Sequence, residues 1–158
     1  MIAYRISLRE YGNAAFSGLG SAFAAQRWNS RNIPLVYASG SLALATLEVL
    51  ANLNTYARLA KTEYVYYAIK VAPRYIENLR EDELPGDWKA YPHSKSTQTI
   101  GDRWFMEKRS LALVVPSAVV PSEKNILFNP LPQDFKRLVI SPPKELKVDP
   151  RLIKMVKG

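Results

Sequence analysis

The sequence predicts an α+β fold in which a mostly antiparallel sheet is accompanied by few helices. First, short apolar segments of strand length recur along the chain, at residues 2–8, 34–39, 63–71, 111–120, 125–130 and 136–143. Second, only one long segment, from residue 42 to about residue 59, is typical of a helix. Third, 158 residues with a hydrophobic share of 47% are enough for a single core, so we interpret residues 1–158 as one domain.

The first half of the chain contains two predicted strands and the predicted helix. Residues 2–8 alternate enough to form a strand, and residues 34–39 form a second, shorter one. Between them, residues 11–32 are rich in Gly, Ser, Ala and Asn, which predicts a loop with a short helical piece. A loop of this length is typical of a functional segment. The residues Ser-Gly-Ser at 39–41 are N-cap candidates for the helix that follows.

The second half of the chain is predicted to supply most of the strands. Residues 63–71 are the clearest strand, because every second residue is apolar and falls on one face. Residues 77–99 are polar and turn-rich, and a short helix is expected over 101–110. A buried strand over 111–120 is broken by Pro116, and strands over 125–130 and 136–143 are separated by the turn Leu-Pro-Gln-Asp. The basic tail, 144–158, is expected to end in a short helix.

The charge of the chain predicts an anionic ligand. The formal net charge is +8, and residues 1–60 contain five Arg and no Lys beside only two acids, Glu10 and Glu48. Arginine binds phosphate through two parallel hydrogen bonds, so the N-terminal third is a candidate anion site. A basic surface without a specific ligand is the alternative. The sequence contains no run of five Lys or Arg residues, so we predict no nucleic-acid-binding tail.

Residue types that are absent narrow the chemistry. The chain has no cysteine, which excludes a disulfide, a thiol nucleophile and a thiolate metal site. Its single histidine, His93, lies in a segment expected to be an exposed loop, so we expect no metal. No stretch resembles a signal peptide and no run of 18 apolar residues occurs. We therefore expect a cytoplasmic protein that has no membrane partner.

Glu48 is the one charged residue among residues 42–53. A helix that is apolar nearly all round is largely buried, and an ionised carboxylate is costly to bury without partners. Glu48 therefore either lies on a narrow solvated stripe with Asn52 and Thr55, or is held at a functional site. Since the strand over 34–39 must fold back on this helix, Tyr37 and Glu48 are expected in one cleft.

The residues around this cleft resemble a known family. The segment "RWN…PLVYASGSLALATLEVL" (27–50) is similar to the core signature of RES domains, which are named for an Arg, a Glu and a Ser. Residues 101–135 resemble the second half of that family, where a Gly and a Trp precede a strand that ends in "PSAVV" and an "N…NP" segment follows. The resemblance covers about residues 4–140, with its elements in the same order.

The resemblance implies a fold similar to ADP-ribosyltransferases and a toxin from a bacterial toxin–antitoxin pair. Such toxins act on NAD, which is then a substrate, and no metal is implied. They degrade NAD by hydrolysis or phosphorolysis, or they transfer ADP-ribose to a protein. The implied partner is an antitoxin with an Xre-like DNA-binding domain that blocks the active site, so contact with DNA is indirect. Whether the toxin forms a homodimer within that complex stays open.

The resemblance also implies site residues. The family Arg, Tyr, Glu and Ser fall on Arg27, Tyr37, Glu48 and Ser117, and a further Arg falls on Arg5. The chain departs from the family at three places. Ala25-Gln26 replaces an expected Gly, Asn32 replaces another, and Asn52 and Asn54 stand where the family often has a His. Asn tolerates a left-handed conformation, so the turn at Asn32 is expected to form.

Cleavage of the nicotinamide–ribose bond would use these residues as follows. The leaving group is already cationic and needs no general acid, while the transition state resembles an oxocarbenium ion. Glu48 would stabilise that positive charge, hold a ribose hydroxyl or activate an acceptor, and Arg27 and Arg5 would bind the pyrophosphate. Tyr37 would stack on the nicotinamide or form a wall, and Ser117 would direct its hydroxyl at Glu48 or the ribose.

Two other functions remain open at this stage. A transferase that modifies a protein would share the whole NAD site and differ only in the acceptor. A nucleic-acid-binding protein or nuclease is suggested by the net charge and by the tyrosines of residues 63–71. Only Lys70 accompanies those tyrosines, which favours a structural role for them.

Overall fold

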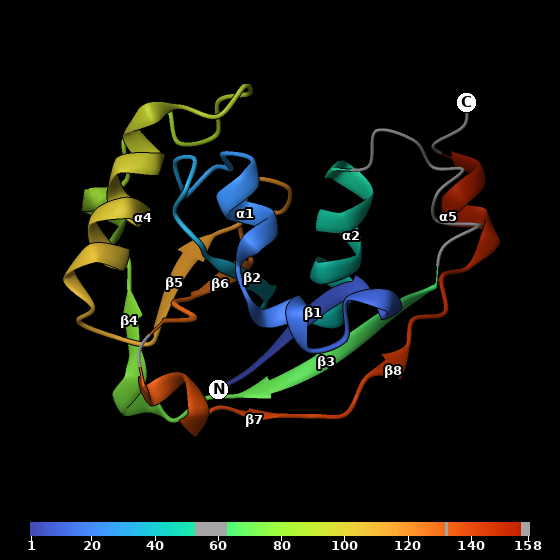
Figure 1. The fold of residues 1–158 in the computed structure, drawn as a ribbon. Helices are drawn as coiled ribbons and strands as arrows, with labels where there is room; N and C mark the ends of the chain where they lie inside the picture. The colour runs from blue at the N-terminus through green and yellow to red at the C-terminus, as the bar shows by residue number, and fades with distance from the viewer. Residues whose placement is uncertain (53–62, 132, 156–158) are drawn as a thin grey trace.

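The computed structural model describes residues 1–52, 63–131 and 133–155. Its described strands form one strongly curled sheet in the order β4-β5-β6-β2-β1-β3-β7, and β8 pairs with β3 (Figure 1). Only β4 and β5 run parallel; the other pairs are antiparallel. The predicted α+β fold with a mostly antiparallel sheet is confirmed. The strands are β1 Ile2–Leu8, β2 Val36–Ser39, β3 Tyr64–Lys70, β4 Ile76–Asn78, β5 Ala112–Pro116, β6 Lys124–Phe128, β7 Val139–Ile140 and β8 Lys144–Glu145.

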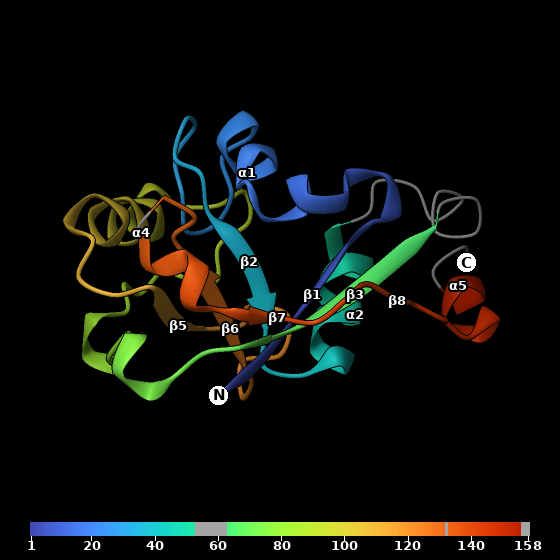
Figure 2. The same cartoon turned by 60° about the horizontal axis from the view of Figure 1, so that its bottom comes forward.

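The centre of the sheet opens between β1 and β2. Strand β1 pairs with β3 along its whole length, from Ile2 opposite Lys70 to Leu8 opposite Tyr64. With β2 it shares only one pair, Tyr4 opposite Ser39. Figure 2 shows the two strands crossing at an angle. Because the ladder ends after one pair, backbone groups of β2 are left for side chains to bond.

Two apolar clusters cover opposite faces of β5 and β6. Ala112, Val114, Ile126 and Phe128 belong to one cluster with residues of β1, β2 and β3. The alternate residues of the same strands, Leu113, Val115 and Leu127, pack with Trp28, Leu35, Trp104 and Phe105 in the other. A strand with both faces covered is apolar without alternation. This accounts for the continuous apolar run that predicted a buried strand over 111–120. The observed strand ends at Pro116 and residues 117–120 lie outside it, so that part of the prediction is wrong.

The helices in the described residues are α1 Leu19–Phe23, α2 Leu42–Asn52, α4 Lys95–Glu107 and α5 Pro150–Met155. Short 3-10 segments are η1 Arg9–Phe16, η2 Pro73–Tyr75, η3 Glu81–Glu83 and η4 Gln133–Arg137. None of these helices is long and apolar enough to cross a membrane. The Ser41 side chain caps α2, because its Oγ accepts a hydrogen bond from the Leu44 N–H at 3.1 Å. The predicted helix over 42–59 is described as far as Asn52, and its remainder lies outside the described residues.

Several predicted boundaries are wrong. Residues 77–99 are not turns throughout, since β4 extends to Asn78 and α4 begins at Lys95. The helix expected over 101–110 is therefore longer, and its polar first turns, "KSTQT", gave no apolar signal. The strand expected over 136–143 is mostly absent, because η4 extends to Arg137 and β7 has two residues. Pro142 and Pro143 follow β7 and have no backbone N–H for a ladder. The short helix expected in the tail is α5.

Candidate functional site

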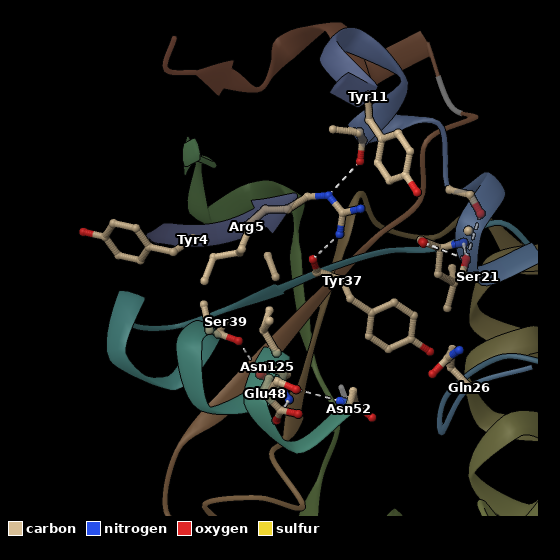
Figure 3. A pocket seen from close by; sticks show the side chains of 18 of the residues that line it. Tyr4, Arg5, Tyr11, Ser21, Gln26, Tyr37, Ser39, Glu48, Asn52 and Asn125 are labelled. Atoms are coloured by element: carbon tan, nitrogen blue, oxygen red, sulfur yellow. Dashed lines mark hydrogen bonds between the residues drawn. The ribbon is translucent and has the colours of Figure 1, made fainter. Parts of the chain in front are cut away.

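A cavity of about 350 Å³ lies where the sheet opens between β1 and β2. Its lining comes from β1, η1, α1, β2, α2 and β6 (Figure 3). Arg5, Tyr37 and Glu48 are among the lining residues, together with Asn125. The strand and the helix thus bring Tyr37 and Glu48 to one cleft, as their sequence order predicts.

Glu48 is half-buried, and two side chains hold its carboxylate. Its Oε1 accepts a hydrogen bond from Ser117 Oγ at 2.7 Å and another from Asn125 Nδ2 at 2.5 Å. Neither donor bonds Oε2, and the described residues give that oxygen no other hydrogen bond. Glu48 lines the cavity, so one oxygen of the carboxylate is fixed by the protein and the other is free for a ligand. A solvated stripe does not account for this arrangement, because the donors come from β6 and from the residue that directly follows β5, both far from α2 in the sequence.

Ser117 lies behind Glu48 and is fully buried. Its Oγ accepts hydrogen bonds from the backbone N–H groups of Val119, at 3.1 Å, and Val120, at 3.0 Å. Because these two donors occupy the lone pairs of the oxygen, the hydroxyl proton is directed at Glu48. Ser117 is not among the cavity-lining residues. Of the two orientations expected for its hydroxyl, toward Glu48 or toward the ribose, the structure has the first.

Arg5 lines the cavity from β1, beside the point where β1 and β2 separate. Its Nε donates to the Ala15 carbonyl and its Nη1 to the Tyr37 carbonyl, each at 2.7 Å. The second bond is made to β2 where the ladder with β1 has ended. Burial lowers the pKa of Arg5 to about 10, so the guanidinium is still charged at neutral pH. Among the described residues, Nη2 has no hydrogen-bond partner, which leaves it for an anion.

The Tyr37 side chain joins the cavity to the "RWN" segment. Its hydroxyl donates to Asn29 Oδ1 at 2.7 Å and accepts from the Trp28 N–H at 3.2 Å. Burial is the main reason that its pKa is raised well above the ordinary range. The phenol is therefore neutral and already bonded, so Tyr37 offers a ligand its ring rather than a proton.

Arg27 has a different position from the other predicted residues. It does not line the cavity, and its Nη1 donates to the backbone carbonyls of Trp88, at 2.5 Å, and Ala90, at 3.0 Å. Burial lowers the pKa of Arg27, while the nearby negative charge of Glu48 acts in the opposite direction. The side chain is thus close enough to Glu48 to interact with its charge, but a loop holds it.

The segment that carries Arg27 is fixed by close packing on α4. A Cβ at Gly101 would lie 1.7 Å from the Trp28 carbonyl oxygen, so only glycine permits this approach. Asp102 Oδ1 accepts from the Ser30 N–H at 2.9 Å. Asn32 has a left-handed φ of 72°, which confirms that asparagine forms the expected turn.

His93 is half-buried, so its prediction as an exposed loop residue is wrong. Its Nδ1 is buried without a hydrogen-bond partner among the described residues. Burial lowers the pKa of His93, and the positive charge of Arg27 lowers it further. A sequence without structural context offered no signal for this proximity, since Arg27 and His93 are far apart along the chain.

Sequence reasoning missed two residues of the site, Asn125 and Ser39. Asn125 Oδ1 accepts a hydrogen bond from Ser39 Oγ at 2.8 Å, and both residues line the cavity. The pair lies at one register position of β2 and β6. The available signal was a polar residue at the border of each apolar strand, which is too common to single out a site.

The fold and the cleft define an α+β protein with a carboxylate and an arginine on the walls of a cavity in a curled sheet. The RES domain family model matches residues 2–149. A protein from Photorhabdus laumondii named Toxin Res is 37% identical over 158 residues, covering 99% of this chain and 100% of its own length. Another Toxin Res, from Yersinia enterocolitica, is 33% identical and covers 96% and 99%. The chain belongs to the RES domain family.

Two further similarities extend this result. A Sphingobium protein named Prs ADP-ribosylating toxin is 33% identical, covering 92% of this chain and 91% of its own length. The fold is also similar to a chain in the crystal structure of the M. tuberculosis MbcT-MbcA toxin-antitoxin complex, with a TM-score of 0.75. That similarity covers 99% of this chain and 88% of the other at 19% identity, so it establishes the fold alone.

Proposed function

We propose that this protein is the toxin of a bacterial type II toxin–antitoxin system and consumes NAD by cleaving its nicotinamide–ribose bond. The observation that carries the proposal is the Glu48 carboxylate, which lines the cavity, is held through Oε1 and has no hydrogen bond to Oε2 from the described residues. The names of the relatives from Photorhabdus and Yersinia support the role of toxin, and the name of the Sphingobium relative supports ADP-ribose chemistry.

In the proposed reaction, the carbon–nitrogen bond between ribose and nicotinamide breaks and the bonding electrons leave with nicotinamide. Glu48 stabilises the positive charge that develops on the ribose, as preorganised charge does in a water-poor site. Arg5 binds the pyrophosphate through its free Nη2, and the ring of Tyr37 forms the wall beside the nicotinamide. Water or phosphate then completes the substitution at the ribose carbon.

The proposed role of Arg27 requires one rearrangement. To bind the pyrophosphate, its guanidinium must turn away from the carbonyls of Trp88 and Ala90 toward the cavity. Ser117 acts by holding Glu48, since it is buried and has no surface on the cavity.

Transfer of ADP-ribose to a protein is the second candidate, because one relative is named as an ADP-ribosylating toxin. It uses the same cavity and replaces water or phosphate by a protein side chain. Incubation with labelled NAD and a cell lysate tests it: labelled protein bands that disappear with Glu48→Gln support this candidate. The nucleic-acid alternative has less support, because Tyr67 is buried and packs edge-on against Phe16 with ring centroids 5.0 Å apart.

The proposed partner is an Xre-like antitoxin that blocks the cavity and contributes the contact with DNA. The toxin–antitoxin complex with a similar fold supports a protein partner. We propose residues 1–158 as a single domain that acts in the cytoplasm, without a metal; a homodimer within the complex stays a prediction.

Release of nicotinamide from NAD by the purified protein tests the proposed function. Wild type is compared with Glu48→Gln, with and without phosphate, and with Glu10→Gln as a matched control at an exposed carboxylate of η1. We expect release by wild type and Glu10→Gln but not by Glu48→Gln. A requirement for phosphate identifies phosphorolysis. Absence of release by folded, antitoxin-free wild type contradicts free NAD cleavage.

A further inference from the structure

Asn125 donates a hydrogen bond directly to the Glu48 carboxylate. Among the candidate residues from the sequence, only Ser117 does the same in the described structure. Asn125 lies in β6, whose backbone is paired on both sides, with β2 and with β5. The backbone ladder therefore holds this strand without the Asn125 side chain. The side chain instead spans from Ser39 Oγ, 2.8 Å from its Oδ1, to Glu48 Oε1, 2.5 Å from its Nδ2.

The direction of these hydrogen bonds is fixed by chemistry. An ionised carboxylate only accepts hydrogen bonds, so the amide must present its NH₂ group to Glu48. The amide oxygen then faces Ser39, whose hydroxyl donates to it. Ser117 also donates to Oε1, because its own oxygen accepts two backbone N–H groups. Both donors thus converge on one oxygen, an arrangement that suits the ionised form of Glu48.

We propose that Asn125, oriented by Ser39, is a positioning residue of the NAD-cleaving site that holds the Glu48 carboxylate in one orientation, with Oε2 directed into the cavity. The inference rests on the proposed function and adds to it a residue that acts through Glu48. Two donors on Oε1 restrict rotation of the carboxylate, so the free oxygen keeps one place relative to the ribose. Stabilisation of a transient positive charge depends on such a fixed geometry.

The kinetic experiment compares Asn125→Ala with Asn125→Asp. Alanine removes the donor, and aspartate keeps the shape and the acceptor for Ser39 but places a second carboxylate against Glu48. We expect kcat for nicotinamide release to fall about 10- to 100-fold with Asn125→Ala, the range for loss of a hydrogen bond to a charged group. Asn125→Asp should lower kcat further, while KM for NAD stays within about threefold. A role in packing alone predicts the opposite order, because aspartate is the closer isostere.

The matched control is Asn129→Ala. Asn129 directly follows β6, is fully buried and donates to the Phe105 carbonyl at 3.1 Å, but does not line the cavity. It should lower the melting temperature without a selective loss of kcat. If Asn125→Ala behaves like Asn129→Ala, or if Asn125→Asp retains the activity of wild type, the positioning role is overturned.

A second measurement does not depend on turnover. Asn125→Asp is made in wild type and in Glu48→Gln, and the melting temperature of each protein is recorded. We expect Tm to fall by roughly 2–4 °C in wild type and by less than half as much in Glu48→Gln, whose side-chain amide can donate to the new carboxylate. Equal decreases in both proteins overturn the contact. Coupled decreases without nicotinamide release by wild type keep the contact but overturn its catalytic role together with the proposed function.

Discussion

The two charged groups of the proposed site, Glu48 and Arg27, are held in different ways. Glu48 is bonded by the side chains of Asn125, which lies in β6, and of Ser117, which directly follows β5. Arg27 is half-buried and bonded by two backbone carbonyls of a loop. A group fixed by side chains on strands is preorganised, whereas a group held by loop carbonyls can exchange them for a stronger acceptor such as phosphate. The carboxylate end therefore suits the chemical step, and the arginine end suits capture of the ligand.

The largest effect is expected from Glu48→Gln, which removes the charge of the preorganised carboxylate. Glutamine has nearly the same shape but no charge, so nicotinamide release should fall at least about 10²- to 10³-fold, as when one stabilising group is lost. Binding of NAD should change little, because Arg5 and Tyr37 are untouched. Steady-state kinetics and calorimetric titration with NAD measure the two quantities. A variant that binds NAD weakly but turns it over at the normal maximal rate contradicts the role of Glu48.

The second largest effect is expected from Ser117→Ala, which tests how Glu48 is held. Alanine removes one of the two donors to Oε1 and leaves the Val119 and Val120 N–H groups without their buried acceptor. We expect kcat to fall about 10- to 100-fold and the free energy of unfolding to fall by about 1–3 kcal/mol. Kinetics and thermal unfolding test the two parts. Normal kcat in a destabilised variant would show that Ser117 maintains only the backbone after β5.

The third largest effect is expected from Arg27→Ala, which tests whether Arg27 binds the ligand. If Arg27 captures the pyrophosphate, KM for NAD should rise about tenfold while kcat changes less, the pattern of lost ground-state binding. The loss of two bonds to loop carbonyls beside solvent should change Tm only slightly. Arg31→Ala is the control, because Arg31 is exposed and contacts Phe23 rather than the cavity. A normal KM combined with a large decrease in Tm would show that Arg27 only stabilises the loop and does not bind NAD.

The same contrast explains what the sequence could predict. Glu48 was identifiable because one carboxylate interrupts an apolar helix, and β3 because apolar residues alternate along it. Asn125 was not, because its role depends on the register that places it opposite Ser39, 86 residues away. The carbonyl partners of Arg27 carry no side-chain signal at all. Local patterns thus predicted most strands and the resemblance supplied the candidate site residues, while the contacts that orient those residues depend on tertiary structure.

The smallest effect is expected at His93, in the loop beside Arg27, and concerns the pH dependence of folding stability. Burial and the charge of Arg27 lower the pKa of His93 below its ordinary value of 6.5. As pH falls below about 6.5, the unfolded chain binds a proton at His93 before the folded protein does, so folding stability decreases. The decrease continues until pH passes below the folded pKa. Above pH 7 the residue is neutral in both states and contributes no pH dependence.

Between pH 7 and pH 5, Tm should therefore fall less in His93→Gln than in wild type. Arg27→Ala should lie between these two proteins. The ranking follows from the two causes, because removal of Arg27 leaves the larger one, burial, in place. Thermal unfolding of the three proteins across this pH range measures the difference. An identical decrease in all of them would mean that acidification acts on other groups. A reduction with both variants would show that Arg27 and His93 share one electrostatic environment.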